Sequence, residues 1–262
     1  LVQKQRIRYS ENSVKIISET LSLEDKRILK TIDYQNYDFK KSLKLQNIDF
    51  AYNNKKNFFT DENFVLECGK VTGIYGQSGS GKSTLLNLIT FLFKPDKGKI
   101  YIDDNEVLND MDKRKFQNIV TFLSQDTFLI EDTIKNNITL SSDQNIDNIK
   151  LEKAIQLACA DKFIKDLPGQ LDYMVGTHGR KISSGQKQRI VIARAFYDAR
   201  EILVLDEATN AIDESTEKEI YQNIIDEKGS KTIVIVSHNK SNLSFCDNKY
   251  EIKDGSIIKL IN

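Results

Sequence analysis

The sequence has no net charge and only three cysteines. Each of these properties disfavours certain classes of function. Lysine plus arginine and aspartate plus glutamate each number 38 among 262 residues, so the nonspecific attraction of a basic protein to nucleic acid is missing. A nucleic-acid partner is therefore not expected. The three cysteines, Cys68, Cys159 and Cys246, are odd in number and widely spaced, which disfavours a disulfide framework or a metal site and fits a reducing cytosol.

Long apolar runs and targeting signals are also missing. No run approaches the roughly 18 consecutive apolar residues of a membrane span, and no charged-then-apolar signal sequence opens the chain. No repeat of about 20 to 50 residues occurs. We therefore expect the chain as given to be soluble, and its length suits one large domain with an appended segment.

The first 42 residues differ from the rest of the chain. Val14, Ile17 and Leu21 have the spacing of an amphipathic helix, and residues 25–41 are charged and tyrosine-rich with little periodicity. We interpret residues 1–42 as a helix and linker before a main domain at residues 43–262. A tail without function and a connection to another domain both fit this segment.

Short apolar runs in the main domain predict an α/β fold. Alternation from Leu43 through Phe50 to Tyr52 indicates a first strand. Later runs are rich in valine and isoleucine without polar alternation, which is typical of parallel strands covered on both faces. These runs occupy residues 71–75, 119–123, 202–205 and 233–236. Helical spacing occurs between them, with apolar residues at Leu85, Leu86, Ile89 and Leu92 and over residues 151–159 and 186–196.

Residues 76–84 read GQSGSGKST and fit the pattern G-x-x-x-x-G-K-[ST] at every fixed position. The run lies between an apolar strand and a helix, as a phosphate-binding loop requires. Glycines let backbone N–H groups approach a phosphate chain, and the helix adds the positive end of its dipole. Lys82 would reach the β- and γ-phosphates, and Ser83 would place its hydroxyl on Mg²⁺. The expected nucleotide-binding residues here are Gly76, Gln77, Ser78, Gly79, Ser80, Gly81, Lys82, Ser83 and Thr84.

A second apolar run, ILVLDE, ends in the acids Asp206 and Glu207. Such a strand delivers both carboxylates to the C-terminal edge of the sheet, where ligands bind in open α/β folds. We expect Asp206 to hold Mg²⁺ through water and Glu207 to act as the general base for the attacking water. An acidic pair alone is more often a charge cluster at a helix N-terminus, so this prediction depends on the phosphate loop.

Between these elements, residues 181–195 read KISSGQKQRIVIARA. This stretch resembles the signature of the ATP-binding cassette (ABC) family, L-S-G-G-Q followed by a Gln-Arg helix. Further motifs stand in the family's order: an aromatic that stacks on adenine, the Q-loop glutamine, a D-loop and the switch histidine. They correspond to Tyr52, Gln125, residues 210–213 (NAID) and His238. The resemblance covers nearly all of residues 43–262.

The resemblance implies a P-loop NTPase fold of the ABC ATPase type, with a mostly parallel core sheet, an antiparallel β subdomain and a helical signature subdomain. It implies ATP and Mg²⁺ as ligands and ATP hydrolysis as the activity. The implied catalytic residues are Lys82, Gln125, Glu207 and His238. The implied metal ligands are Ser83, Gln125 and Asp206. A second nucleotide-binding domain, identical or different, would close on the ATP with its signature residues, which here are Ser183, Ser184, Gly185 and Gln186.

Two stretches, residues 124–138 and 167–186, resemble the exporter type of cassette. In that type the cassette follows membrane spans on the same chain. The resemblance implies a transmembrane domain missing from this chain, a place at the cytoplasmic face of the inner membrane, and export or flipping of a substrate as the function.

The chain departs from the family pattern in two places. Ser184 replaces the first glycine of the signature, and Met174, Thr177 and His178 replace residues of a loop that in the family contacts the membrane domain's coupling helix. Ser184 motivates one alternative, an ATP sensor with weak turnover. The other alternative is a non-transport ABC ATPase.

Overall fold

The computed structural model describes residues 38–52, 58–125, 128–141, 146–198, 200–227 and 229–260, apart from the Met111 side chain. These residues belong to one compact unit. The helix predicted before residue 38 lies outside the described residues, and the division at residue 42 stays a prediction. At the start of the described chain Phe39 is buried, and the N–H groups of Lys40 and Lys41 donate to the Asp103 carboxylate.

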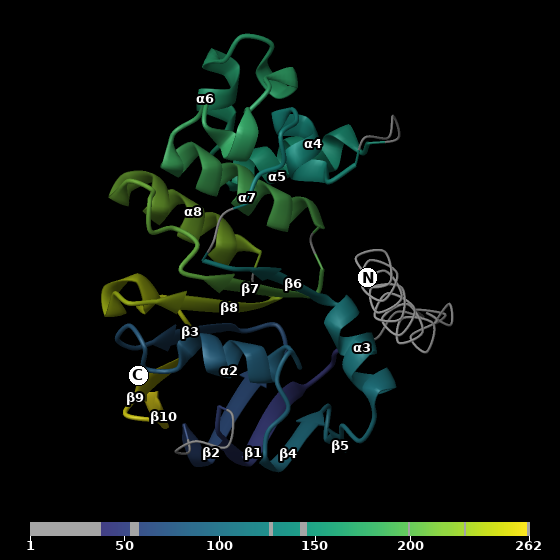
Figure 1. The fold of residues 1–262 in the computed structure, drawn as a ribbon, viewed down its shortest axis with the longest axis vertical. Helices are drawn as coiled ribbons and strands as arrows, with labels where there is room; N and C mark the ends of the chain where they lie inside the picture. The colour runs from purple at the N-terminus through teal and green to yellow at the C-terminus, as the bar shows by residue number, and fades with distance from the viewer. Residues whose placement is uncertain are drawn as a thin grey trace, which may run out of the picture. The chain divides into compact units, whose positions relative to one another are not determined.

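Two β-sheets form the frame of this unit (Figure 1). The four-stranded sheet has the order β2-β1-β4-β5 and is antiparallel. The six-stranded sheet has the order β10-β9-β3-β8-β7-β6 and is parallel except for β10. The strands are β1 (Ser42–Phe50), β2 (Phe59–Glu67), β3 (Val71–Tyr75), β4 (Lys97–Ile102), β5 (Asn105–Glu106), β6 (Val120–Leu123), β7 (Ile202–Asp206), β8 (Thr232–Ser237), β9 (Asn248–Lys253) and β10 (Ser256–Leu260). The prediction of a mostly parallel core sheet with an antiparallel β subdomain is confirmed.

Helices pack against the frame and against one another (Figure 1). Helices α4, α5 and α6 gather beside α7 and form the predicted helical subdomain. The α-helices are α2 (Lys82–Ile89), α3 (Asp110–Asn118), α4 (Ile134–Thr139), α5 (Asn148–Leu157), α6 (Asp161–Asp166), α7 (Ser184–Asp198) and α8 (Glu214–Asp226). The 3-10 helices are η1 (Gln170–Asp172), η2 (Thr177–Gly179) and η3 (Lys240–Leu243).

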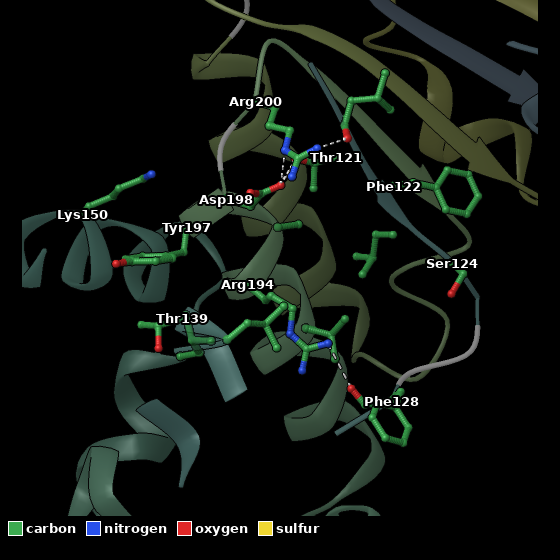
Figure 2. Close-up of a pocket in the computed structure, with 16 residues that line it drawn as sticks. Thr121, Phe122, Ser124, Phe128, Thr139, Lys150, Arg194, Tyr197, Asp198 and Arg200 are labelled. Atoms are coloured by element: carbon green, nitrogen blue, oxygen red, sulfur yellow. Dashed lines mark hydrogen bonds and ion pairs between the residues drawn. The ribbon is translucent and has the colours of Figure 1, made fainter. Parts of the chain in front are cut away.

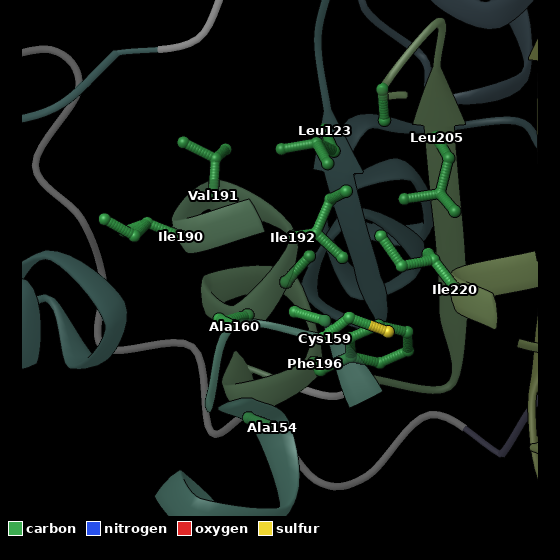
Figure 3. Close-up of a cluster of buried hydrophobic side chains, with 14 of the residues drawn as sticks. Leu123, Ala154, Cys159, Ala160, Ile190, Val191, Ile192, Phe196, Leu205 and Ile220 are labelled. Carbon is green, nitrogen blue, oxygen red and sulfur yellow. The ribbon is translucent and has the colours of Figure 1, made fainter. Parts of the chain in front are cut away.

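The six-stranded sheet is buried on both faces, which explains its continuous apolar strands. Ile202 and Val204 of β7 point into a core that contains α2 and the antiparallel sheet. The alternate residues Leu203 and Leu205 point into a second core with α7 and α8. Figure 3 shows Leu205 in this second core, near side chains of both helices. The sheet therefore holds its strand ends between two packed layers.

Two local predictions needed correction. The helix after the phosphate loop was expected to include Leu92, but α2 ends at Ile89 and Leu92 is 62% exposed. Phe91 adopts a left-handed conformation with φ 58°, which stops the helix. The first strand ends at Phe50 and not at Tyr52, and a bulge near Asn47 explains its irregular alternation.

Candidate active site

The glycine-rich loop connects β3 to α2 at the C-terminal edge of the parallel sheet. Gly79 and Gly81 have φ values of 75° and 117°, which favour glycine. A Cβ on Gly81 would clash with the Phe58 ring, whereas a Cβ on Gly79 would meet no atom within 4 Å. The loop thus leaves bare backbone next to open space, as a phosphate chain requires.

Lys82 connects the loop to the end of β7. Its side chain is buried, and its Nζ donates to the carbonyl oxygens of Gly76 and Gln77 at 3.0 Å each. The same Nζ lies 3.3 Å from Oε1 of Glu207. The two residues from separate motifs therefore meet, as the sequence predicted for a shared site.

Ser83 and Asp206 form a second link between the loop and β7. Ser83 Oγ donates to Asp206 Oδ2 at 3.3 Å. Burial raises the pKa of the Asp206 carboxyl above its ordinary value, and the charge of Glu207 adds to this shift. A hydroxyl and a carboxylate oxygen at this spacing are the hard ligands that Mg²⁺ prefers.

Glu207 has partners on both carboxylate oxygens. Oε1 faces Lys82, and Oε2 accepts a hydrogen bond of 3.0 Å from Asn210 Nδ2. Its backbone is left-handed, with φ 50°, a conformation that non-glycine residues adopt infrequently and that often marks functional sites. Its N–H donates to the Val236 carbonyl at 3.2 Å, which ties this turn to β8.

A cavity of about 370 Å³ opens over these residues. Its lining includes Tyr52, Gln125 and His238 from three further segments. Tyr52 is 43% exposed, and its hydroxyl lies 2.8 Å from Thr84 Oγ1. The residues that line the cavity are Tyr52, Phe58, Ser78, Gly79, Gly81, Lys82, Ser83, Thr84, Gln125, Glu207 and His238.

The signature residues do not line this cavity. Among the described residues, Ser183 instead lies directly before α7, and Ser184–Gln186 begin this helix. Gln186 N–H donates to Ser183 Oγ at 3.2 Å, and Ser183 N–H donates to Gln186 Oε1 at 2.9 Å. These reciprocal bonds are a capping box. Ser184 is exposed, so its extra Cβ and hydroxyl meet solvent.

Sequence reasoning assigned no role to three residues that shape the site. Phe58 packs against the loop, Asn210 holds Glu207, and the buried Gln188 accepts a hydrogen bond of 2.7 Å from Ala211 N–H. Asn210 was part of the D-loop motif, so its position signalled the site. The roles of Phe58 and Gln188 depend on contacts between distant segments.

A second cavity of about 510 Å³ lies between β6 and α7 (Figure 2). Arg194 on its wall donates from Nε to the Asn137 carbonyl at 2.7 Å and from Nη1 to the Phe128 carbonyl at 3.1 Å. Phe128 is 57% exposed, and its ring lies 6.2 Å from the His178 ring in an edge-on arrangement. The loop that departs from the family pattern therefore borders this groove.

The sequence matches a known protein family, in agreement with these features of the fold and the site. A sequence profile described as ABC transporter matches residues 59–210. The chain belongs to the ABC transporter family. The predicted resemblance to the ABC family is thereby confirmed, and relatives that are ATP-dependent by name agree with the predicted ATPase class.

Individual relatives of this ABC domain are exporters and flippases by name. It is 36% identical over 218 residues to an ATP-dependent lipid A-core flippase of Photobacterium profundum, covering 83% of this chain and 37% of the relative. It is 38% identical over 197 residues to the flippase of the same name from Blochmanniella pennsylvanica, covering 75% and 34%. The chain thus spans little more than a third of the length of these relatives.

A solved structure has the same fold as this ABC domain. The chain is similar to a bacterial Atm1-family ABC exporter with ATP bound, with a TM-score of 0.76 and 28% identity over 84% of this chain and 38% of that one. The predicted resemblance to exporter-type cassettes is therefore confirmed. Within the part of the chain that the structure describes, no helix has the length and apolar character to cross a membrane.

Proposed function

We propose that this ABC domain binds Mg-ATP in the cavity over the phosphate loop and hydrolyses it to drive export across a membrane. The observation that carries the proposal is the meeting of Lys82, the Ser83–Asp206 pair and Glu207 at one sheet edge. The loop also fits an anion, because Ser80 Oγ is buried and has no hydrogen-bond partner among the described residues.

Each residue has a defined task in this proposal. Lys82 exchanges its loop carbonyls and Glu207 for phosphate oxygens, which leaves the Glu207 carboxylate able to accept a proton from water. Ser83, Asp206 and Gln125 hold Mg²⁺, which when bound neutralises charge on the phosphates. Tyr52 stacks on the adenine and His238 donates toward the γ-phosphate. Positioning and electrostatics supply most of the acceleration.

We further propose that two nucleotide-binding domains close on the ATP. In this chain the signature residues form the exposed start of a capped helix outside its own cavity. Ser183 and Gly185 would therefore serve the nucleotide held by the other domain. The exposure of Ser184 supports tolerance of this serine at the interface. The partner is a second copy or a different subunit.

We propose a transmembrane partner because the relatives are a flippase and an exporter by name and are more than twice as long as this chain. We place its docking surface at the groove between β6 and α7, beside the loop with Met174, Thr177 and His178. Thr177 Oγ1 donates to Glu131 Oε2 at 2.8 Å, so this loop has an ordered polar contact without the family's charged residues. The ABC domain would then lie at the cytoplasmic face of the inner membrane.

The test compares ATP turnover, ATP binding and size on a column for the wild type and Glu207→Gln of the full-length protein. Glu207→Gln should lose turnover by orders of magnitude, keep ATP binding and accumulate ATP-induced dimers. Glu214→Gln, an exposed carboxylate change on α8, is the matched control and should behave as wild type. Full turnover in Glu207→Gln would refute the role of the base. ATP binding without turnover in the wild type would favour the sensor alternative.

A further inference from the structure

A carboxylate outside the predicted motifs connects two segments that carry catalytic residues. Glu217 lies near the start of α8, and its Oε1 accepts a hydrogen bond of 2.6 Å from Thr209 Oγ1 and one of 3.0 Å from Asn242 Nδ2. Thr209 comes two residues after Glu207, and Asn242 comes four residues after His238. One oxygen atom therefore joins the segment after β7 to the segment after β8.

A buried tyrosine adds a further hydrogen bond to this network. The Tyr221 hydroxyl lies 2.9 Å from Thr209 Oγ1, and both residues are buried. Thr209 has a single O–H, which it donates to Glu217, because a carboxylate can only accept. The Tyr221 hydroxyl is therefore the donor to Thr209 Oγ1, and burial raises the pKa of Tyr221, which keeps the phenol protonated. Thr209 and Tyr221 are buried and Glu217 and Asn242 are half-buried, and a satisfied side-chain network of this kind makes the segments that it joins more rigid.

The turn that contains Glu207 is held at its far end as well. Ala211 N–H donates to Gln188 Oε1 at 2.7 Å, and a Cβ on Gly185 would lie 2.9 Å from the Ala211 carbonyl oxygen. Thr209 is the fixed point between Glu207 and Ala211. A displacement of Thr209 would therefore move the Glu207 carboxylate relative to the phosphate loop.

We propose that Glu217 is a positioning residue for ATP hydrolysis, because it fixes the distance between the turn with Glu207 and the turn with His238. The inference rests on the proposed ATPase site, and it adds a residue that the motifs do not contain. Glu217 does not line the cavity. It acts through Thr209 and Asn242, so its loss should alter turnover and leave nucleotide binding in place.

The first test is Glu217→Ala in the full-length protein. We expect turnover to fall about 10- to 100-fold, as small misplacements of catalytic groups do, while the ATP dissociation constant changes less than about twofold. Glu217→Gln keeps an oxygen that accepts both hydrogen bonds, and it should restore most of the turnover. Glu214→Ala removes an exposed carboxylate from the same turn of α8 and should match the wild type.

The second test needs no nucleotide. Amide hydrogen exchange over residues 207–213 and 238–243 should become faster together in Glu217→Ala, because both segments lose the same acceptor. A third test measures ATP turnover again: Thr209→Val should reproduce the loss of turnover, and the double variant with Glu217→Ala should lose little more than either single variant. Thr209→Ser keeps the hydroxyl and should therefore keep most of the wild-type turnover.

The results of these tests distinguish a failure of the positioning role of Glu217 from a failure of the proposed ATPase function. Wild-type turnover in Glu217→Ala, with an active wild type and an inactive Glu207→Gln, would overturn the positioning role alone. Equal losses of turnover, ATP binding and thermal stability in Glu217→Ala would also overturn it, since they indicate general unfolding. An inactive wild type that binds no ATP would overturn the proposed function itself. In that case, unchanged amide hydrogen exchange of residues 207–213 and 238–243 in Glu217→Ala would refute the link through Glu217.

Discussion

Lys82 Nζ lies 3.3 Å from Glu207 Oε1, in a pair whose side chains are only 7% and 13% exposed. The phosphate loop and the end of β7 are thus joined by an ion pair between the two residues expected to bind phosphate and activate water. A buried charge needs a partner, so Lys82 can leave Glu207 only when another anion takes its place. This exchange would make the base available in step with nucleotide binding.

We predict that Lys82→Ala lowers the affinity for ATP. Removing the ammonium group deletes charge-assisted hydrogen bonds worth about 1.5–3 kcal/mol each, so ATP affinity should fall about tenfold or more. A titration with a fluorescent ATP analogue measures this change. Lys94→Ala removes an exposed lysine near the end of α2 and serves as the control for net charge. Unchanged affinity in Lys82→Ala would contradict the site.

We predict that Gly185→Ala creates a steric clash at the start of α7. In Gly185→Ala the new Cβ would lie 2.9 Å from the backbone oxygen of Ala211, which has no flexible side chain to move. Such overpacking costs about 1–3 kcal/mol, against the roughly 1 kcal/mol that alanine gains over glycine in a helix. We expect a lower melting temperature and lower ATP turnover. Ser184→Ala, at the exposed neighbouring position, should leave the melting temperature unchanged, and an equal fall of the melting temperature in both variants would contradict the close approach.

Much of the fold could be predicted from local patterns. The strands around Val204 and Val234 were predicted correctly because both of their faces are buried, which produces continuous apolar runs. The turn between β3 and α2 was predicted correctly because Gly79 and Gly81 occupy backbone conformations that favour glycine. In these elements the sequence constraint is local, so a short stretch carries it.

The remaining features depend on contacts between distant segments. The end of α2 is set by the left-handed Phe91, and an aromatic residue gives no signal for that conformation. The hydrogen bond from Asn242 to Glu217 joins residues 25 positions apart, so no periodicity reveals it. The capping box of Ser183 and Gln186 was visible in the sequence as S-x-x-Q, but the family signature provided another explanation for the same letters.

Arg194 predicts a stability effect at the second cavity. Burial lowers its pKa, yet the guanidinium stays charged and donates to the carbonyls of Asn137 and Phe128. Arg194→Ala would leave the half-buried Asn137 carbonyl without its partner, at a cost of about 1–3 kcal/mol. The bond to the Phe128 carbonyl is exposed, so water can replace it. Urea unfolding should show this loss, whereas Arg180→Ala at an exposed site should stay within about 0.5 kcal/mol. A similar midpoint for both variants would refute the anchoring role.

The cysteines predict a pH dependence of alkylation. Burial raises the pKa of Cys159 to about 11 and of Cys246 to about 12, and it also raises the pKa of the less buried Cys68. A raised pKa means that less of the reactive thiolate is present at pH 8. Iodoacetamide should therefore label the native protein slowly and at Cys68 first, with labelling of Cys159 and Cys246 increasing only well above that pH.

Peptide mapping by mass spectrometry measures the rate at each cysteine. In urea all three thiols should react at similar rates, because unfolding returns their pKa values to about 8.5. Cys68→Ser should remove the fastest native phase and leave the other two slow. If Cys246 in the native protein were labelled at pH 8 as fast as Cys68, the thiol would not be buried beside Gly73 as the fold requires.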